Sequence, residues 1–297
     1  KRKMKVFSFI ICFLFFRHLG KGQKDTMSVS ISDSSITPQL YKILKTDGGE
    51  LIGEILKQDS REVFFKTHDG REFYIPQHSI KEIVKLDAKE FNKQGHFVGE
   101  EPFATRYFIS TNGLPIKKGD SYVLWNWYGP DVQFGLADNF GVGLITTWFG
   151  APAIGTIKKS FELNDRTQCA VGGLFGSGSW GSFDAFGALP FGLISFGDRN
   201  RNIAFSGGYG LISNNGDSDA GILTSVAGMT KVTDKVSLVC ETFFIIPQAQ
   251  NSTPITLLFP DLRIHQAEGK AIQFGISGIF IDGESFGLPM FQWYRAF

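Results

Sequence analysis

The sequence predicts an all-β protein: an up-and-down antiparallel transmembrane β-barrel of about twelve strands, preceded by a small β-module. Three observations predict this fold class. After Ser121, apolar residues recur at every second position along successive runs. Short turn sequences separate these runs, and no stretch has convincing helical periodicity. Glycine (35 residues) and phenylalanine (30 residues) are both frequent, as is typical of β-structures with many tight turns.

Composition excludes several classes of protein. The formal net charge is +1, so charge does not suggest a nucleic-acid partner or an acidic surface. The three cysteines, Cys12, Cys169 and Cys240, do not form a disulfide framework pattern.

Residues 1–22 have the pattern of a secretory signal peptide. Basic residues come first, and the apolar run 6–16 is too short to span a bilayer as a helix. Gly20 and Gly22 fit a cleavage site, and the alternative is a buried N-terminal helix. Residues 23–39 are polar and rich in serine, which predicts a flexible linker.

Residues 40–86 alternate between short apolar runs and turn signals. Asp47-Gly48 and Asp69-Gly70 lie between such runs, and this dipeptide is the strongest short hairpin signal. The arrangement of D-G-x-x-x-x-G-x-I followed by D-G-x-x-x-x-I-P-x-x-x-I resembles small SH3-like or Sm-like β-barrels. The apolar runs predict five short strands, at 41–46, 51–57, 63–67, 71–75 and 79–86, a number that also suggests a barrel of this kind. Such modules can bind RNA, but the signal peptide instead favours a spacer or a module with a periplasmic partner.

Residues 87–102 are charged and predict a second linker, and residues 103–297 are expected to form the barrel with a lead-in strand. The lead-in, FATRYFIST at 103–111, is expected to be a strand beside the barrel. In the last part of the chain, Ile272 and Phe274 share one parity and Gln273 the other, which predicts one oily and one polar face. The predicted barrel strands are 121–128, 131–137, 140–149, 154–163, 167–176, 183–196, 202–212, 220–231, 235–246, 255–263, 271–280 and 287–296.

An even strand number agrees with single-chain bacterial barrels, although the short second run leaves ten strands as an alternative. Asp and Asn residues mark one set of turns, which we predict to be periplasmic. These turns are 138–139, 164–166, 198–202 and 233–235, and the predicted outer loops are 150–153, 177–181, 213–219, 247–254 and 281–285.

Residues 104–297 resemble a family of outer-membrane β-barrels common in Bacteroidetes, most of them without an assigned activity. The resemblance implies the barrel and a Gram-negative outer membrane, with the N-terminal module in the periplasm, but no chemistry. The pieces that carry it are RYF at 106–108, IKKGDSYV at 116–123, FGLADNFGVG at 134–143 and FQWYRAF at 291–297.

The aromatic ending provides a candidate assembly signal, formed by Phe291, Trp293 and Phe297. It implies the barrel assembly machinery as a partner, besides outer-membrane lipid. The third residue from the end is usually aromatic in this signal, and here it is Arg295.

Polar residues opposite the oily face are the candidate lumen-facing residues: Glu241, Asp184, Gln133 and Gln273. One hypothesis is a polar lumen that binds or passes a small solute. The alternative is a plugged interior in which the carboxylates pair with Arg or Lys of neighbouring strands.

No catalytic or metal-binding pattern is found, and no cofactor is expected. The five histidines are scattered, and His265, four residues after Asp261, is expected in a surface turn. No set of Ser, His and Asp residues that could act together in nucleophilic catalysis can be assembled from the sequence. The sequence therefore predicts a non-enzymatic, porin-like outer-membrane barrel that is either structural or a narrow solute passage. The alternative is a soluble periplasmic β-sandwich binding protein, because a sandwich core also alternates.

Overall fold

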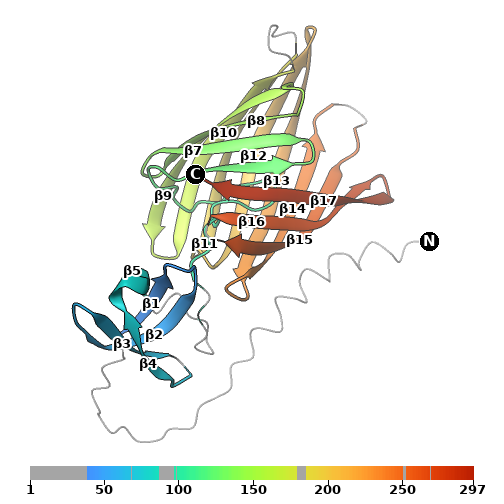
Figure 1. Cartoon of the computed structure of the whole chain (residues 1–297). Coiled ribbons are helices and arrows are strands. Elements are labelled where there is room, and N and C mark those ends of the chain that lie inside the picture. The colour runs from blue at the N-terminus through green and yellow to red at the C-terminus, as the bar shows by residue number, and fades with distance from the viewer. Residues whose placement is uncertain are drawn as a thin grey trace, which may run out of the picture.

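The computed structural model describes residues 39–67, 69–86, 97, 99–178, 185–249, 252–267 and 269–297. They form two β-structures, a small sheet and a large barrel (Figure 1). The predicted all-β class is confirmed. The predicted signal peptide and residues 23–38 of the first linker lie outside the described residues. Within the described ranges, no helix has the length and apolar character to span a membrane.

The small sheet has five antiparallel strands in the order β4-β3-β2-β1-β5. A 3-10 turn, Gln77–Ser79, lies between β4 and β5. Its core is formed by Ile43, Val63, Phe65 and Ile75, all nearly or fully buried. Each strand begins and ends within about two residues of the run predicted from alternation. The strands are β1 (Leu40–Lys45), β2 (Glu50–Gln58), β3 (Glu62–Thr67), β4 (Glu72–Pro76) and β5 (Ile80–Lys85).

The barrel has twelve antiparallel strands, each paired with the next, and β17 pairs with β6 to close it. The predicted count of twelve is confirmed, and the predicted alternative of a two-sheet sandwich is wrong for this part of the chain. The strands are β6 (Ser121–Asn126), β7 (Gly129–Ala137), β8 (Phe140–Thr146), β9 (Ala153–Asn164), β10 (Thr167–Ser177), β11 (Ala185–Gly197), β12 (Arg201–Asn214), β13 (Asp217–Lys231), β14 (Val236–Pro247), β15 (Ile255–Ala267), β16 (Lys270–Ile281) and β17 (Glu284–Ala296).

The two ends of the barrel differ in their connections. At one end, called the turn end, short turns join β7 to β8, β9 to β10, β11 to β12, β13 to β14 and β15 to β16. The turn after β7 places Asn139 at φ 66°, a conformation that asparagine tolerates better than most residues. The opposite end, called the loop end, carries the remaining connections, including 147–152.

The two faces of the barrel wall differ in polarity. On β12, the outward-facing Phe205 and Leu211 are 43% and 48% exposed, whereas the inward-facing Asn202 and Ala204 are buried. The same alternation continues around the barrel because the side-chain period of a strand is two. Further outward-facing apolar residues with exposed side chains are Trp125, Phe134, Leu144, Phe161, Val171, Phe196, Ile222, Leu238, Phe274 and Trp293.

The barrel wall is shorter on the side formed by β6 and β8 than elsewhere. Strands β6 and β8 have 6 and 7 residues, whereas β17 has 13. As a result, β17 pairs with β6 only through Gln292–Ala296. The rest of β17, Glu284–Phe291, is paired with β16 on its other side.

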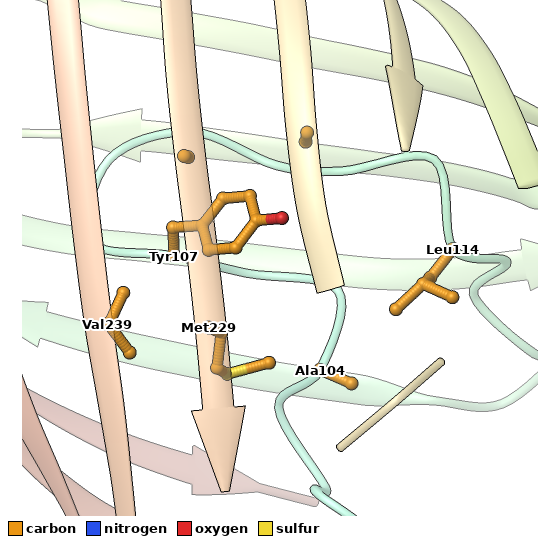
Figure 2. Packing of buried hydrophobic residues seen from close by; sticks show 7 residues of the cluster. Ala104, Tyr107, Leu114, Met229 and Val239 are labelled. Atoms are coloured by element: carbon orange, nitrogen blue, oxygen red, sulfur yellow. The ribbon is translucent and has the colours of Figure 1, made fainter. Parts of the chain in front are cut away.

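Residues 99–120, called the lumen segment, run through the interior of the barrel. Ala104, Tyr107 and Leu114 of this segment pack against Met229 and Val239 of the wall (Figure 2). The predicted lead-in strand at 103–111 is wrong: its only β-pairing is an isolated bridge between Arg106 and Thr111. The predicted position beside the barrel is also wrong, because Phe103, Tyr107 and other members of the segment are fully buried inside it.

Candidate functional site in the barrel lumen

Arg263 of β15 is the centre of a buried network that holds the lumen segment. Its side chain is fully buried, and its guanidinium is stacked 4.6 Å from the ring centroid of Tyr294. Guanidinium nitrogens donate to the carbonyl oxygens of Phe103 (3.0 Å), Arg106 (2.7 Å) and Tyr107 (3.2 Å). Three carbonyls of an irregular segment thereby obtain the partners that a strand would have supplied.

Two side chains complete the shell around Arg263. Its Nε donates to Gln273 Oε1 at 2.9 Å, and its Nη1 lies 3.1 Å from Glu101 Oε1. Arginine can donate five hydrogen bonds in a fixed planar arrangement, and each of its three nitrogens has an acceptor here. A buried charge in this setting is costly to leave without its partners.

Glu101 belongs to the lumen segment and lies at the turn end. Its Oε2 accepts hydrogen bonds from Ser237 (2.6 Å) and lies 2.8 Å from His265 Nε2. Burial alone would raise the pKa of Glu101, but the Arg263 charge and the contact with His265 lower it to about 2. The carboxylate is therefore ionised at neutral pH and completes a fully buried ion pair with Arg263.

The middle of the segment is anchored by two other carboxylates. Glu241 of β14 accepts the backbone N–H groups of Ile109 (2.8 Å) and Ser110 (2.7 Å). Asp131 of β7 pairs with Arg106, and both side chains are buried. Because each carboxylate receives donors from the segment, the wall and the segment satisfy each other's polar groups.

Lys158 of β9 holds the part of the segment that follows. Its ammonium donates to Thr111 Oγ1 (2.9 Å) and to the carbonyl oxygens of Asn112 (3.0 Å) and Leu114 (3.3 Å). Three donors are thus used, which is the full capacity of an ammonium group.

An apolar floor lies beyond this network, towards the loop end. Phe108 of the lumen segment stacks on Phe259, with centroids 5.6 Å apart and an interplanar angle of 8°. Phe243 meets the same Phe259 ring edge-on at 6.1 Å, and Met290 completes the buried cluster. The segment therefore separates a polar part of the lumen from an apolar part.

Little open space remains beside the segment. A cavity of about 50 Å³ is lined by Arg106, Tyr122, Gln133, Lys158 and neighbouring residues. It has room for only a few water molecules, since liquid water occupies about 30 Å³ per molecule. Among the described residues, both oxygens of Asp261 and the Nε2 of Gln273 are buried without a hydrogen-bond partner.

The residues predicted to face the lumen lie as follows. Glu241 and Gln273 are fully buried and contact the lumen segment and Arg263, respectively. Gln133 lies between Asp131 and Thr156, and its Oε1 accepts from Thr156 at 3.1 Å. Asp184 lies outside the described residues.

These positions support the alternative of a plugged interior only in part. The lumen segment fills the turn-end part of the interior, but the donors to Glu241 are backbone amides of the chain itself and not Arg or Lys of neighbouring strands. Sequence alternation correctly separates the two faces but contains no information on the path of a non-repetitive segment.

The three residues of the predicted assembly signal face outward. Phe291, Trp293 and Phe297 are 41%, 52% and 66% exposed. The Phe297 ring meets Phe134 edge-on, with centroids 6.1 Å apart. Their role as an assembly signal stays a prediction.

Sequence reasoning missed the centre of the network. Asp261 and Arg263 fall within the predicted strand 255–263, and His265 is expected in a turn beyond it, whereas all three lie within β15 and face inward. The expected surface position of His265 is wrong, because its side chain is only 9% exposed and contacts Glu101. The signal that could have found them is the alternation of these three polar residues with Leu262 and Ile264.

The described residues contain no group of three or more His, Cys, Asp or Glu side chains that could hold a metal ion. The two described cysteines, Cys169 and Cys240, are not joined in a disulfide. Chemically, the lumen is suited to immobilising a chain segment, because Arg263, Glu241, Asp131 and Lys158 are each paired with or hydrogen-bonded to that segment. Comparisons with protein-family models, with curated proteins and with solved structures find no match.

Proposed function

We propose that this chain is a non-enzymatic outer-membrane β-barrel protein whose own lumen segment closes the barrel to solutes. In this proposal the barrel is a membrane anchor in a Gram-negative outer membrane, and the small sheet is a periplasmic module. The finer assignments, to a Bacteroidetes barrel family and to an SH3-like module, rest on the sequence resemblances alone.

One observation carries the proposal: the outward face of a closed barrel is apolar and exposed, whereas the buried charged and amide side chains of the strands face inward. Soluble proteins rarely expose contiguous apolar patches of more than a few hundred Å². In a bilayer the same surface is favourable, and a closed barrel leaves the backbone groups of its wall paired.

Closure to solutes is supported by the filled lumen. Arg263, Glu241 and Lys158 each use their hydrogen-bonding capacity on the lumen segment. Removing the segment from the lumen would leave these buried charges without partners, which costs several kcal/mol for each ion. The narrow-passage version of the function is therefore disfavoured relative to the anchor.

The membrane assignment is tested by replacing Phe205 with Arg in protein refolded into phospholipid vesicles. Phe205 faces outward at the fifth of the 14 positions of β12, within the exposed apolar surface, so Phe205→Arg should lower the free energy of unfolding by about 2–4 kcal/mol in lipid. The control is Val232→Arg, in the turn after β13, with an expected loss of about 0–1 kcal/mol. Equal stability of both variants, or wild-type protein that stays soluble without detergent or lipid, would contradict the assignment.

Closure is tested by conductance in planar bilayers. Correctly inserted wild-type protein, identified by heat-modifiable gel migration, should give no steady channel current. Sustained current from the inserted wild type would show an open passage and would contradict the anchor.

A further inference from the structure

The lumen wall changes character beyond the apolar floor. In its loop-end part, many inward-facing side chains are apolar and only partly buried, unlike the buried polar groups near Arg263. Leu223 and Leu257 already pack on the floor formed by Phe108, Phe243 and Met290. Further inward-facing apolar residues of this part are Ile145, Ile154, Leu174, Leu189, Phe191, Ile245, Ile255 and Ile279. We call this set the apolar chamber wall.

The barrel strands contain long stretches without a basic residue. Lys, Arg and His are absent from residues 119–157, 167–198, 202–230, 236–262 and 271–294. Two basic side chains, Arg106 and Lys158, line one cavity with Leu174 and Phe191 of the chamber wall. Both are already bound within the protein, because Arg106 pairs with Asp131 and Lys158 donates to three oxygen atoms of the lumen segment. Acidic residues do occur near the loop-end turns, at Asp217, Asp219, Asp282 and Glu284. Binding of an anionic head group ordinarily requires arginine or lysine, so these charges disfavour it.

The chamber wall is open on one side. Beyond Gln292, strand β17 is not paired with β6, because β6 ends at Asn126. Phe286 and Leu288, in this unpaired part of β17, are 52% and 47% exposed although they face the barrel interior. Among the described residues, no backbone hydrogen bond covers this edge of Glu284–Phe291. The side chains of this edge nevertheless present an apolar surface at the opening.

The opening makes the two apolar surfaces of the barrel continuous. Outward-facing Phe291 and Ile276 lie on the same two strands as inward-facing Leu288 and Ile279. Residues 286–291 of this edge carry no charged side chain, so a hydrophobic molecule could pass there from the outside of the wall to the chamber.

We propose that the chamber binds the hydrocarbon chain of an amphiphile that lacks an anionic head group and that arrives from the bilayer through the opening between β17 and β6. This inference rests on the proposed membrane location. Burying the chain against the chamber wall would remove apolar surface from water, which is worth about 0.8 kcal/mol for each buried CH₂ group.

The site offers a matched pair of blocking and control substitutions. Gly210 of β12 faces the chamber, and an added Cβ would meet its nearest heavy atoms at 3.7 Å, an ordinary contact. Gly207, on the outward face of the same strand, has open space around an added Cβ. Neither glycine has a positive φ, so Gly210→Phe fills the chamber while Gly207→Phe adds the same ring outside.

The experiment uses full-length protein in phosphatidylcholine vesicles and a hexadecanol probe with a mid-chain diazirine. After irradiation, mass spectrometry should find labelled inward-facing residues such as Leu223 and Leu257, besides outward-facing ones. Gly210→Phe should remove the inward labelling, and Gly207→Phe should leave it unchanged. The corresponding hexadecanoate probe should label the inward positions far less.

Three results would overturn the proposal: labelling confined to outward-facing residues, inward labelling that Gly210→Phe does not change, or equal inward labelling by hexadecanoate. Heat-modifiable migration of the same samples separates this inference from the proposed function. Protein that is inserted but not labelled inside contradicts the chamber alone, whereas protein that does not insert contradicts the membrane anchor and the inference with it.

Discussion

The turn-end half and the loop-end half of the lumen differ in the side chains that the same strands direct inward. Near the turn end, the inward-facing residues include charged and amide side chains, and the chain's own segment provides hydrogen-bond partners for several of them. Near the loop end, inward-facing residues are apolar and partly exposed, and no described segment covers them. The contrast indicates that the chain's own segment permanently fills the turn-end half, whereas the described residues leave the loop-end half open.

The two halves are expected to differ in how strongly a substitution lowers the free energy of unfolding. A buried ion such as Arg263 is costly unless all its partners are present, so the turn-end half tolerates little change. A half-exposed apolar side chain has no such requirement. Substitutions in the two halves should therefore differ in cost, and the following predictions test that difference in order of decreasing effect.

Arg263→Met should have the largest effect. It leaves Glu101 buried without its cation and removes the donors to three carbonyl groups, so the free energy of unfolding should fall by about 3–5 kcal/mol. Urea unfolding in vesicles, followed by tryptophan fluorescence, measures it. The control is Arg201→Met, an exposed arginine, which should change stability by less than about 0.5 kcal/mol. Equal losses of stability in the two variants would show that the Arg263 network contributes no more to stability than an exposed arginine does.

Glu241→Gln should have an intermediate effect. The amide keeps one oxygen, but its NH₂ group would face a backbone N–H that Glu241 now accepts. The expected loss is about 1–3 kcal/mol, as for a buried donor left unsatisfied. The same unfolding experiment applies, with the exposed Glu162→Gln as control. A loss no larger than that of the control would indicate that Glu241 does not accept the backbone N–H groups of residues 109–110.

Ile245→Ser should cost least, although it introduces a hydroxyl in place of a large apolar group. Ile245 lines the chamber and is only partly buried, so we expect a loss of about 1 kcal/mol. The substitution should weaken hexadecanol labelling at the neighbouring Leu223. A loss as large as that for Arg263→Met would indicate a tightly packed core in place of an open chamber.

The strands could be predicted from sequence because their signal is local. Alternation such as Ile272, Gln273 and Phe274 defines both the strand and its two faces. The count of twelve followed from repeating this pattern. The low wall at β6 was less visible, because it depends on where strands stop and not on which residues they contain.

The lumen segment could not be predicted because its contacts are distant in sequence. Arg263 and Glu101 are separated by 162 positions, and Ser110 and Glu241 by 131. Neither partner has a local pattern that identifies the other, and the segment's apolar run, FATRYFIST, imitates a strand. In the structure its carbonyl groups are satisfied by side chains of the wall, so strand propensity did not decide its conformation.

The most direct test of the account asks which face of the wall meets lipid. Val226 and Ser225 are adjacent on β13, with Val226 outward and 37% exposed and Ser225 inward and buried. Each is replaced by cysteine, after Ser substitution of the native cysteines, and labelled with bimane before refolding into vesicles that contain brominated phospholipid. We predict strong quenching at position 226 and little at position 225. Equal quenching, or stronger quenching at 225, would contradict the account.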